Sequence, residues 1–437
     1  METLVIIPSL MHKYSFSAPL AWLFAHDIDR VRGIYSAHLN KVWVQKYDQF
    51  IVELNWFIEL YEFGLIVRFI KTHNPNARIL FGGLYSQLKY KKIFKEHPVD
   101  YFIKGDAEIP IREYLNGTRP EEIPNMIGRH FENRHTYHFS ADQFENLEFS
   151  LDWIPEYEEG WMSFPEPGNF EDMSFEHLPK YPQYWENPKK KLPLSLRWRV
   201  APRGGRYHLP MLFTGRGGCP AAHSGCDYCM GSKHHVMQSI YDRPPVIMTN
   251  DHLIHLLEKI EKKFMRMSLY VNTNCQYDLS GYQFDLDATV EIDCASTARE
   301  AERLTSGFKK ANVHVALFEE GITGKKARAS VDDYLALEDE NHRLHFFATS
   351  DDIKRLNIPE ESRLYTEFVF PFWTDWNYYN DDRKAFTKSR QWYQVTGQTN
   401  LYPKPKQLIS RIVRPIAINT LWIMQRAGIL DIKKLIL

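Results

Sequence analysis

The chain has 437 residues, enough for two or three domains at roughly 150 residues each. Its 54 Lys and Arg against 55 Asp and Glu leave a net charge of −1, which excludes the strong positive field of a general nucleic-acid-binding protein. Hydrophobic residues make up 44% and charged residues 25%, so a folded chain rather than a disordered one is expected.

Residues 1–117 alternate between short apolar runs and segments with helical periodicity. The runs predict strands at 4–7, 33–35, 50–52, 79–81 and 101–103, with helices over 57–72 and 108–115. Strands separated by helices predict a Rossmann-like parallel sheet, which binds its ligands at the carboxyl ends of the strands. Those ends carry Ser9, Asn55, Gly82, Gly83, Gly105 and Asp106.

The second half of the chain returns to this alternation after a stretch rich in Pro, Glu, Trp and Tyr. Strands are expected at 211–213, 268–271, 288–292, 313–318, 344–348 and 364–370, and a helix over 253–264 with Thr249 among its N-cap candidates. Six such strands predict a partial (β/α)6 TIM-like barrel with its site on the C-terminal rim. The predicted α/β domains are 1–120, an extended connector over 121–208, the barrel over 209–371, and a C-terminal loop and helical cap over 372–437.

Three of the five cysteines fall within eleven residues with the spacing C-x6-C-x2-C: Cys219, Cys226 and Cys229. Thiolates on one glycine-rich loop bind zinc or an iron–sulfur cluster. A closed zinc site needs four ligands, and His223, His234 or His235 would supply the fourth. Three cysteines without a fourth nearby suit a [4Fe–4S] cluster with one open iron.

Because the N-terminus lacks a basic segment and no run of about 18 apolar residues exists, we expect a reduced, cytoplasmic protein without a membrane span.

The run from 213 to 229 resembles the signature of radical S-adenosylmethionine (SAM) enzymes. It has a strand, then Thr-Gly-Arg-Gly-Gly-Cys, then the cysteine cluster with Tyr228 before its last member; the first two cysteines are three residues further apart than usual. The resemblance implies that Cys219, Cys226 and Cys229 hold a [4Fe–4S] cluster. It also implies that SAM binds the fourth iron and is cleaved to a 5′-deoxyadenosyl radical, and that Tyr228 contacts the adenine. An electron donor such as flavodoxin or ferredoxin is implied as a partner.

Residues 79–83 and 99–108, with 123–129 and 151–155, resemble the cobalamin-binding domain and connector that precede many radical SAM domains. Together the two resemblances cover about residues 1–370. They imply that Asn55, Trp56, Gly82, Gly83 and Gly105 lie near cobalamin. The chain has no Asp-x-His-x-x-Gly after its first strand, so either cobalt has no histidine ligand or the domain has lost its cofactor.

Further polar residues follow the barrel strands, at positions that family members use to bind SAM: Asn274, Glu291 and Asp293. The expected function is cobalamin-dependent methylation of an unactivated carbon of a small molecule or peptide. The second hypothesis is a radical SAM reaction without methyl transfer, such as a rearrangement, ring contraction, epimerisation or oxidation. The third hypothesis is a zinc-stabilised binding or sensor protein. Neither a nucleic-acid partner nor a membrane partner is expected.

Overall fold

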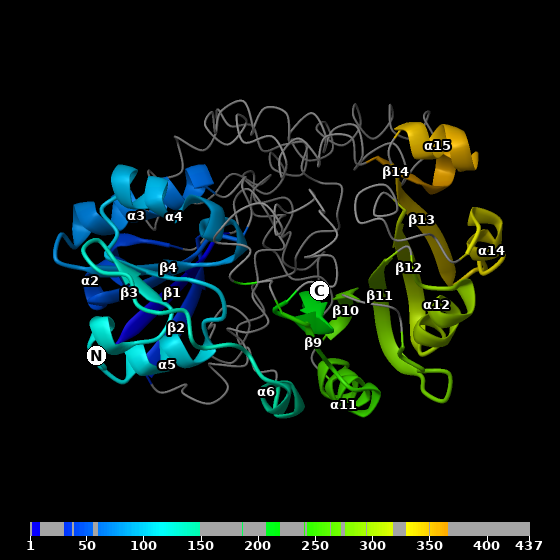
Figure 1. The fold of residues 1–437 in the computed structure, drawn as a ribbon, viewed down its shortest axis with the longest axis horizontal. Coiled ribbons are helices and arrows are strands. Elements are labelled where there is room, and N and C mark those ends of the chain that lie inside the picture. The colour runs from blue at the N-terminus through cyan, green and yellow to red at the C-terminus, as the bar shows by residue number, and fades with distance from the viewer. Residues whose placement is uncertain are drawn as a thin grey trace, which may run out of the picture.

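A computed structural model of the chain describes residues 2–8, 30–36, 39–55, 60–148, 186, 207–218, 240, 243–262, 264–271, 276–293, 295–317, 329–348 and 350–365. Within these residues the structure is α/β, with two six-stranded sheets and a two-stranded ribbon. Figure 1 shows the two sheets side by side, with β1–β4 on the left and β11–β13 on the right. We refer to them as the first and second units.

The first unit contains the predicted Rossmann-like sheet. Its elements are β1 (Thr3–Ile7), β2 (Val31–Tyr35), α2 (Lys41–Lys46), β3 (Gln49–Glu53), α3 (Leu60–His73), β4 (Arg78–Gly82), α4 (Leu84–Glu96), β5 (Tyr101–Ile103), α5 (Glu108–Leu115), η4 (Pro120–Glu122), β6 (Met126–Gly128) and α6 (Ala141–Glu145). All five predicted strands are confirmed and pair in parallel. The sequence did not predict β6, which adds an antiparallel edge strand beside β5.

The strand order of the first sheet is β2-β1-β3-β4-β5-β6, the flavodoxin-like doubly wound order extended by one strand. Its strands are apolar on both faces because both faces are covered. One face packs with α3 and α4 in an apolar cluster that includes Phe63, Phe81 and Phe102. The other face joins an apolar cluster that continues into the second unit. The chain changes winding direction at β1, between β2 and β3, which places the topological switch point there.

The second unit confirms the six predicted parallel strands, which lie in the order of the chain. Its elements are β7 (Tyr207–Phe213), β8 (Gly215–Arg216), β9 (Val246–Ile247), α11 (Asn250–Ile260), β10 (Phe264–Tyr270), β11 (Phe284–Asp293), α12 (Ala298–Thr305), β12 (Phe308–Ala316), α14 (Val331–Leu335), β13 (His342–Ala348), α15 (Ser350–Leu356), η7 (Glu360–Ser362) and β14 (Arg363–Tyr365). Adjacent strands of the sheet β14-β13-β12-β11-β10-β7 all pair in parallel. This is the strand sequence of a partial (β/α)6 barrel.

The strands of the second sheet alternate between apolar and polar side chains, unlike those of the first. Val290, Val313 and Phe346 are buried with the helices, and the ring of Tyr334 on α14 lies 6.0 Å from that of Phe346. Figure 1 shows α12 and α14 on the side of this sheet away from the first unit. The intervening residues therefore form a polar face on the opposite side.

The helix predicted over 253–264 is confirmed as α11, but it ends at Ile260, and Phe264 begins β10 instead, because its buried side chain belongs to the apolar face of the sheet. Thr249, an expected N-cap, accepts a hydrogen bond from the backbone N–H of His252 through its Oγ1 at 3.2 Å. The predicted strand over 364–370 begins as β14, and residues 366–437 lie outside the described residues. The predicted connector is described only up to 148, at 186 and from 207. In the described parts of the chain, none of the helices has both the length and the apolar character needed to cross a bilayer.

Candidate functional site

The cysteine loop leaves the second sheet at the carboxyl end of β7, as the sequence predicts. Thr214, directly after this strand, donates its backbone N–H to the carbonyl of Tyr270 (3.0 Å) and accepts from the N–H of Met248 (2.8 Å). β8 then pairs antiparallel with β9, so the two ends of the loop are held together at its base. Four predicted residues of the loop lie outside the described residues: Cys219, Cys226, Tyr228 and Cys229.

Two glycines shape the start of this loop. Gly217 and Gly218 have φ values of 54° and 66°, in the left-handed region that favours glycine. A Cβ on Gly217 would overlap the guanidinium of Arg243, and one on Gly218 would overlap the backbone of Arg243 and Pro244. The glycine-rich stretch before Cys219 therefore packs closely against the returning chain.

One residue from each of five adjacent strands forms a row on the polar face, at or near the carboxyl ends. These paired positions, which we call the polar row, are Phe213, Tyr270, Glu291, His314 and His345. The rings of Phe213 and Tyr270 lie 5.4 Å apart, and those of His314 and His345 lie 5.6 Å apart at 89°. The sequence predicted Glu291 as a site residue but missed the two histidines, although each occupies a polar position between apolar neighbours in its strand.

Burial controls the charge of the polar row. It raises the pKa of Glu291 to about 7. Burial and the neighbouring His345 lower the pKa of His314 to about 3, and burial and Arg343 lower that of His345 to about 4. At neutral pH the imidazoles of His314 and His345 are therefore uncharged. The carboxyl group of Glu291 titrates near neutral pH. Within the described residues, Nδ1 of His345 has no hydrogen-bond partner.

The structure describes one of the two other predicted SAM contacts, Asp293, and its carboxylate bonds within the protein. Asp293 is buried, and its Oδ1 accepts hydrogen bonds from the backbone N–H of Ala295 (3.1 Å) and from Oγ of Ser296 (3.2 Å). It therefore shapes the turn after β11. Asn274 lies outside the described residues.

At the switch point of the first sheet, a buried carboxylate ends β3. Oε2 of Glu53 accepts from Nδ2 of Asn55 at 3.0 Å, and burial raises the pKa of Glu53 well above its usual value, although that hydrogen bond opposes the rise. Within the described residues, Oε1 of Glu53 has no hydrogen-bond partner. The sequence predicted Asn55 here and missed Glu53, because nothing in its pattern separates it from a strand-end surface residue. Trp56 lies outside the described residues.

The three predicted glycines at this edge have different surroundings. Among the described residues, a Cβ on Gly82 would meet no atom within 4 Å, which leaves room for a close approach. Gly83 has φ 111°, and a Cβ there would lie 2.6 Å from Oδ1 of Asn55 and from the carbonyl of Leu54. Gly105 has φ 75°, and a Cβ there would lie 2.5 Å from Nε2 of His135. Contacts within the protein thus account for Gly83 and Gly105.

Replacing Gly83 with alanine is expected to destabilise the first unit by about 1–3 kcal/mol, since an unfavourable φ and a close contact act together. Denaturant unfolding would measure the loss. The matched control is Gly82→Ala, one residue earlier and without a close contact. An equal loss in both variants would mean that the close approach of Gly83 to Leu54 and Asn55 does not matter.

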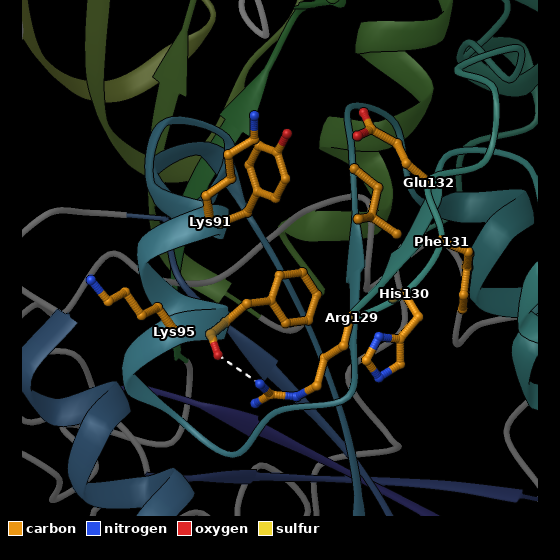
Figure 2. A pocket seen from close by; sticks show the side chains of 10 residues that line it. Lys91, Lys95, Arg129, His130, Phe131 and Glu132 are labelled. Carbon is orange, nitrogen blue, oxygen red and sulfur yellow. Dashed lines mark hydrogen bonds between the residues drawn. The ribbon is translucent and has the colours of Figure 1, made fainter.

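A pocket of about 570 Å³ lies elsewhere, between α4 and the edge strand β6 (Figure 2). Arg129 donates three hydrogen bonds to the carbonyls of Val99 (2.9 Å), Phe94 (2.8 Å) and His97 (2.6 Å), and so braces the turn between α4 and β5. None of the predicted site residues that the structure describes lines this pocket.

Among the described residues, no group of three or more His, Cys, Asp or Glu side chains is placed to hold a metal ion. The predicted ligands Cys219, Cys226 and Cys229 are not among the described residues.

Comparisons with known proteins gave structural matches only. No protein-family model and no curated protein sequence matches the chain. The chain is similar in structure to cobalamin-dependent radical SAM enzymes. One is the radical SAM methyltransferase TsrM from Kitasatospora setae, solved with tryptophan and a SAM analogue: the TM-score is 0.48 at 12% identity, covering 80% of this chain and 67% of that one.

A second TsrM structure, with cobalamin and a [4Fe–4S] cluster, matches with a TM-score of 0.49 at 12% identity, over 84% of this chain and 72% of that one. OxsB, solved with aqua-cobalamin and SAM, matches with a TM-score of 0.45 at 10% identity, over 89% of this chain and 56% of that one.

Proposed function

We propose that this protein is a radical SAM enzyme. The observation that carries the proposal is the position of the C-x6-C-x2-C loop, which begins at the carboxyl end of an edge strand in a six-stranded parallel sheet. Sites of (β/α) barrels form at this end of the strands. Three thiolates on one loop fit a [4Fe–4S] cluster, because soft sulfur ligands select iron–sulfur centres. When bound, the cluster supplies the electron that cleaves SAM to a 5′-deoxyadenosyl radical.

In this proposal the chain's own residues bind and orient the cluster and SAM. Cys219, Cys226 and Cys229 hold the cluster, and Tyr228 contacts the adenine. Asn274, Glu291 and Asp293 bind the polar groups of SAM. Of these three, Glu291 has the strongest structural support, because it lies in the polar row on β11, and only β10 separates β11 from β7, the strand that leads into the cysteine loop.

The polar row also favours one kind of substrate. Its two neutral imidazoles supply hydrogen-bond donors and acceptors but no positive charge, so they suit an uncharged, hydrogen-bonding small molecule or peptide better than a phosphorylated one. A flavodoxin or ferredoxin would deliver the electron.

For the first unit we propose cobalamin as the ligand, bound over the carboxyl ends of β3 and β4. The open space at Gly82 and the buried carboxyl group of Glu53 at the switch point support a ligand there. With cobalamin present, the reaction we favour is methylation of an unactivated carbon. Without it, the enzyme would perform a radical reaction that transfers no methyl group.

Metal and cofactor analysis of anaerobically purified protein tests these assignments together. We expect iron and inorganic sulfide in equal amounts with a broad visible absorption, and release of 5′-deoxyadenosine when SAM and a reductant are added. Retained cobalamin would support methyl transfer; its absence after supplementation would favour the other radical reactions. A colourless protein that carries only zinc would refute the radical SAM assignment.

A further inference from the structure

Four charged side chains join the first unit to both ends of the cysteine loop. Asp106 and Glu108 follow β5, Arg216 lies in β8 just before the loop, and Arg243 lies just before β9 where the loop returns. Arg216 pairs with Glu108 through its Nη1, and its Nε lies 3.3 Å from Oδ1 of Asp106. Nη2 of Arg243 lies 2.6 Å from Oδ2 of the same aspartate.

This cluster is buried and closely packed. The side chains of Glu108 and Asp106 are 1% and 7% exposed, and those of both arginines about 20%. Oδ2 of Asp106 also accepts from the backbone N–H of Phe139 at 2.8 Å, and the guanidinium of Arg216 lies 4.7 Å from the centre of the Phe139 ring. Each charge therefore has a partner and a fixed position.

The arrangement has a geometric consequence for the loop. Arg216 and Arg243 bracket the cysteines in the sequence, and both pair with Asp106. Gly217 and Gly218 let the chain pass directly against Arg243. Planar guanidinium groups impose direction on their partners, which apolar contacts do not. The position of the loop base is thus set by residues of the other unit.

We propose that Asp106, Glu108, Arg216 and Arg243 form a clamp that positions the cysteine loop against the first unit, with Asp106 and Glu108 as positioning residues for the cluster. The inference rests on the proposed function for the identity of the cluster. Asp106 and Glu108 follow the carboxyl end of β5, at the edge where we place cobalamin. The same short segment therefore links the two cofactor sites.

Glu108→Gln and Asp106→Asn test the clamp in the full chain. Breaking a buried ion pair leaves an uncompensated charge, so we expect retained iron per chain to fall by roughly tenfold or more after reconstitution. The EPR signal of the reduced cluster should change in the iron that remains. Amide hydrogen exchange should rise over 214–218 and 243–248, but not in β3 and β4. The matched control is Asp285→Asn, which breaks an exposed ion pair with Lys309 (2.9 Å) in the second unit.

Arg243→Lys keeps the positive charge but loses the planar guanidinium group that directs the ion pair. It provides a milder variant if the carboxylate variants do not fold, and it should show smaller changes in iron content, EPR signal and exchange. Unchanged iron, EPR signal and exchange in the variants would overturn the clamp and leave the proposed function intact. A wild-type protein without iron would overturn the proposed function. In that case the hydrogen-exchange data would still test whether the clamp anchors the base of the loop. Increased exchange in the variants would support this anchoring role, and unchanged exchange would overturn it.

Discussion

Replacing Cys226 with alanine is expected to abolish cluster binding and reduce SAM cleavage to background, and the same result is expected for Cys219→Ala and Cys229→Ala. A [4Fe–4S] cluster held by these three thiolates has no spare cysteine on this loop. Iron and sulfide content, the EPR spectrum of the reduced protein, and 5′-deoxyadenosine release measure the effect. The fold should persist, since the described ribbon at the loop base contains none of the cysteines.

Cys275→Ala is the control, because Cys275 lies outside the C-x6-C-x2-C motif and should not be a ligand. Full SAM cleavage in any of the three motif variants would remove that cysteine from the proposed mechanism. Loss of iron in the control would assign it as a ligand instead.

Replacing Glu291 with glutamine is expected to stabilise the protein at alkaline pH and much less at acidic pH. Burial raises the pKa of this carboxyl from 4.5 to about 7, so the unfolded chain ionises before the folded one does. Stability is therefore lost as the pH rises between these two values, and the full cost is present above about pH 7. Glutamine removes this cost.

At 1.36 kcal/mol per pKa unit, the gain from Glu291→Gln should be about 2–3 kcal/mol larger near pH 8 than near pH 5. Denaturant unfolding of both proteins at the two pH values measures it, with Glu258→Gln, an exposed carboxylate on α11, as the matched control. A gain that is equal at both pH values would show that Glu291 is not held in a desolvated position.

The prediction for the three cysteines depends on the sequence, whereas the prediction for Glu291 depends on the tertiary structure. The cysteine ligands were predicted from their spacing and from the resemblance that this spacing supports, because a motif within eleven residues needs no knowledge of the fold. The unusual state of Glu291 came from its surroundings. Its neighbours in the polar row, Tyr270 and His314, are 21 and 23 residues away along the chain, and only strand pairing brings them together.

The clamp could not have been found by pattern. Glu108 was expected only as the first residue of a helix and as the end of a segment that resembles cobalamin-binding domains, and Arg216 only as part of the loop motif. Their pairing spans more than a hundred residues and joins a helix of the first unit to the ribbon at the base of the cysteine loop. Likewise β6 was missed because three residues carry too little periodicity, and it forms because β5 offers an open edge.

By itself the sequence determined the two α/β units, most of their strands, the helices α3, α5 and α11, and the cysteine motif that indicates the chemistry. These depend on local periodicity, capping and spacing, which are properties of neighbouring residues. The tertiary structure alone decided which strands lie in register, which carboxyl groups lose their water, and how the first unit holds the cysteine loop. Those features come from contacts and burial between distant segments, and neither exists until the chain has folded.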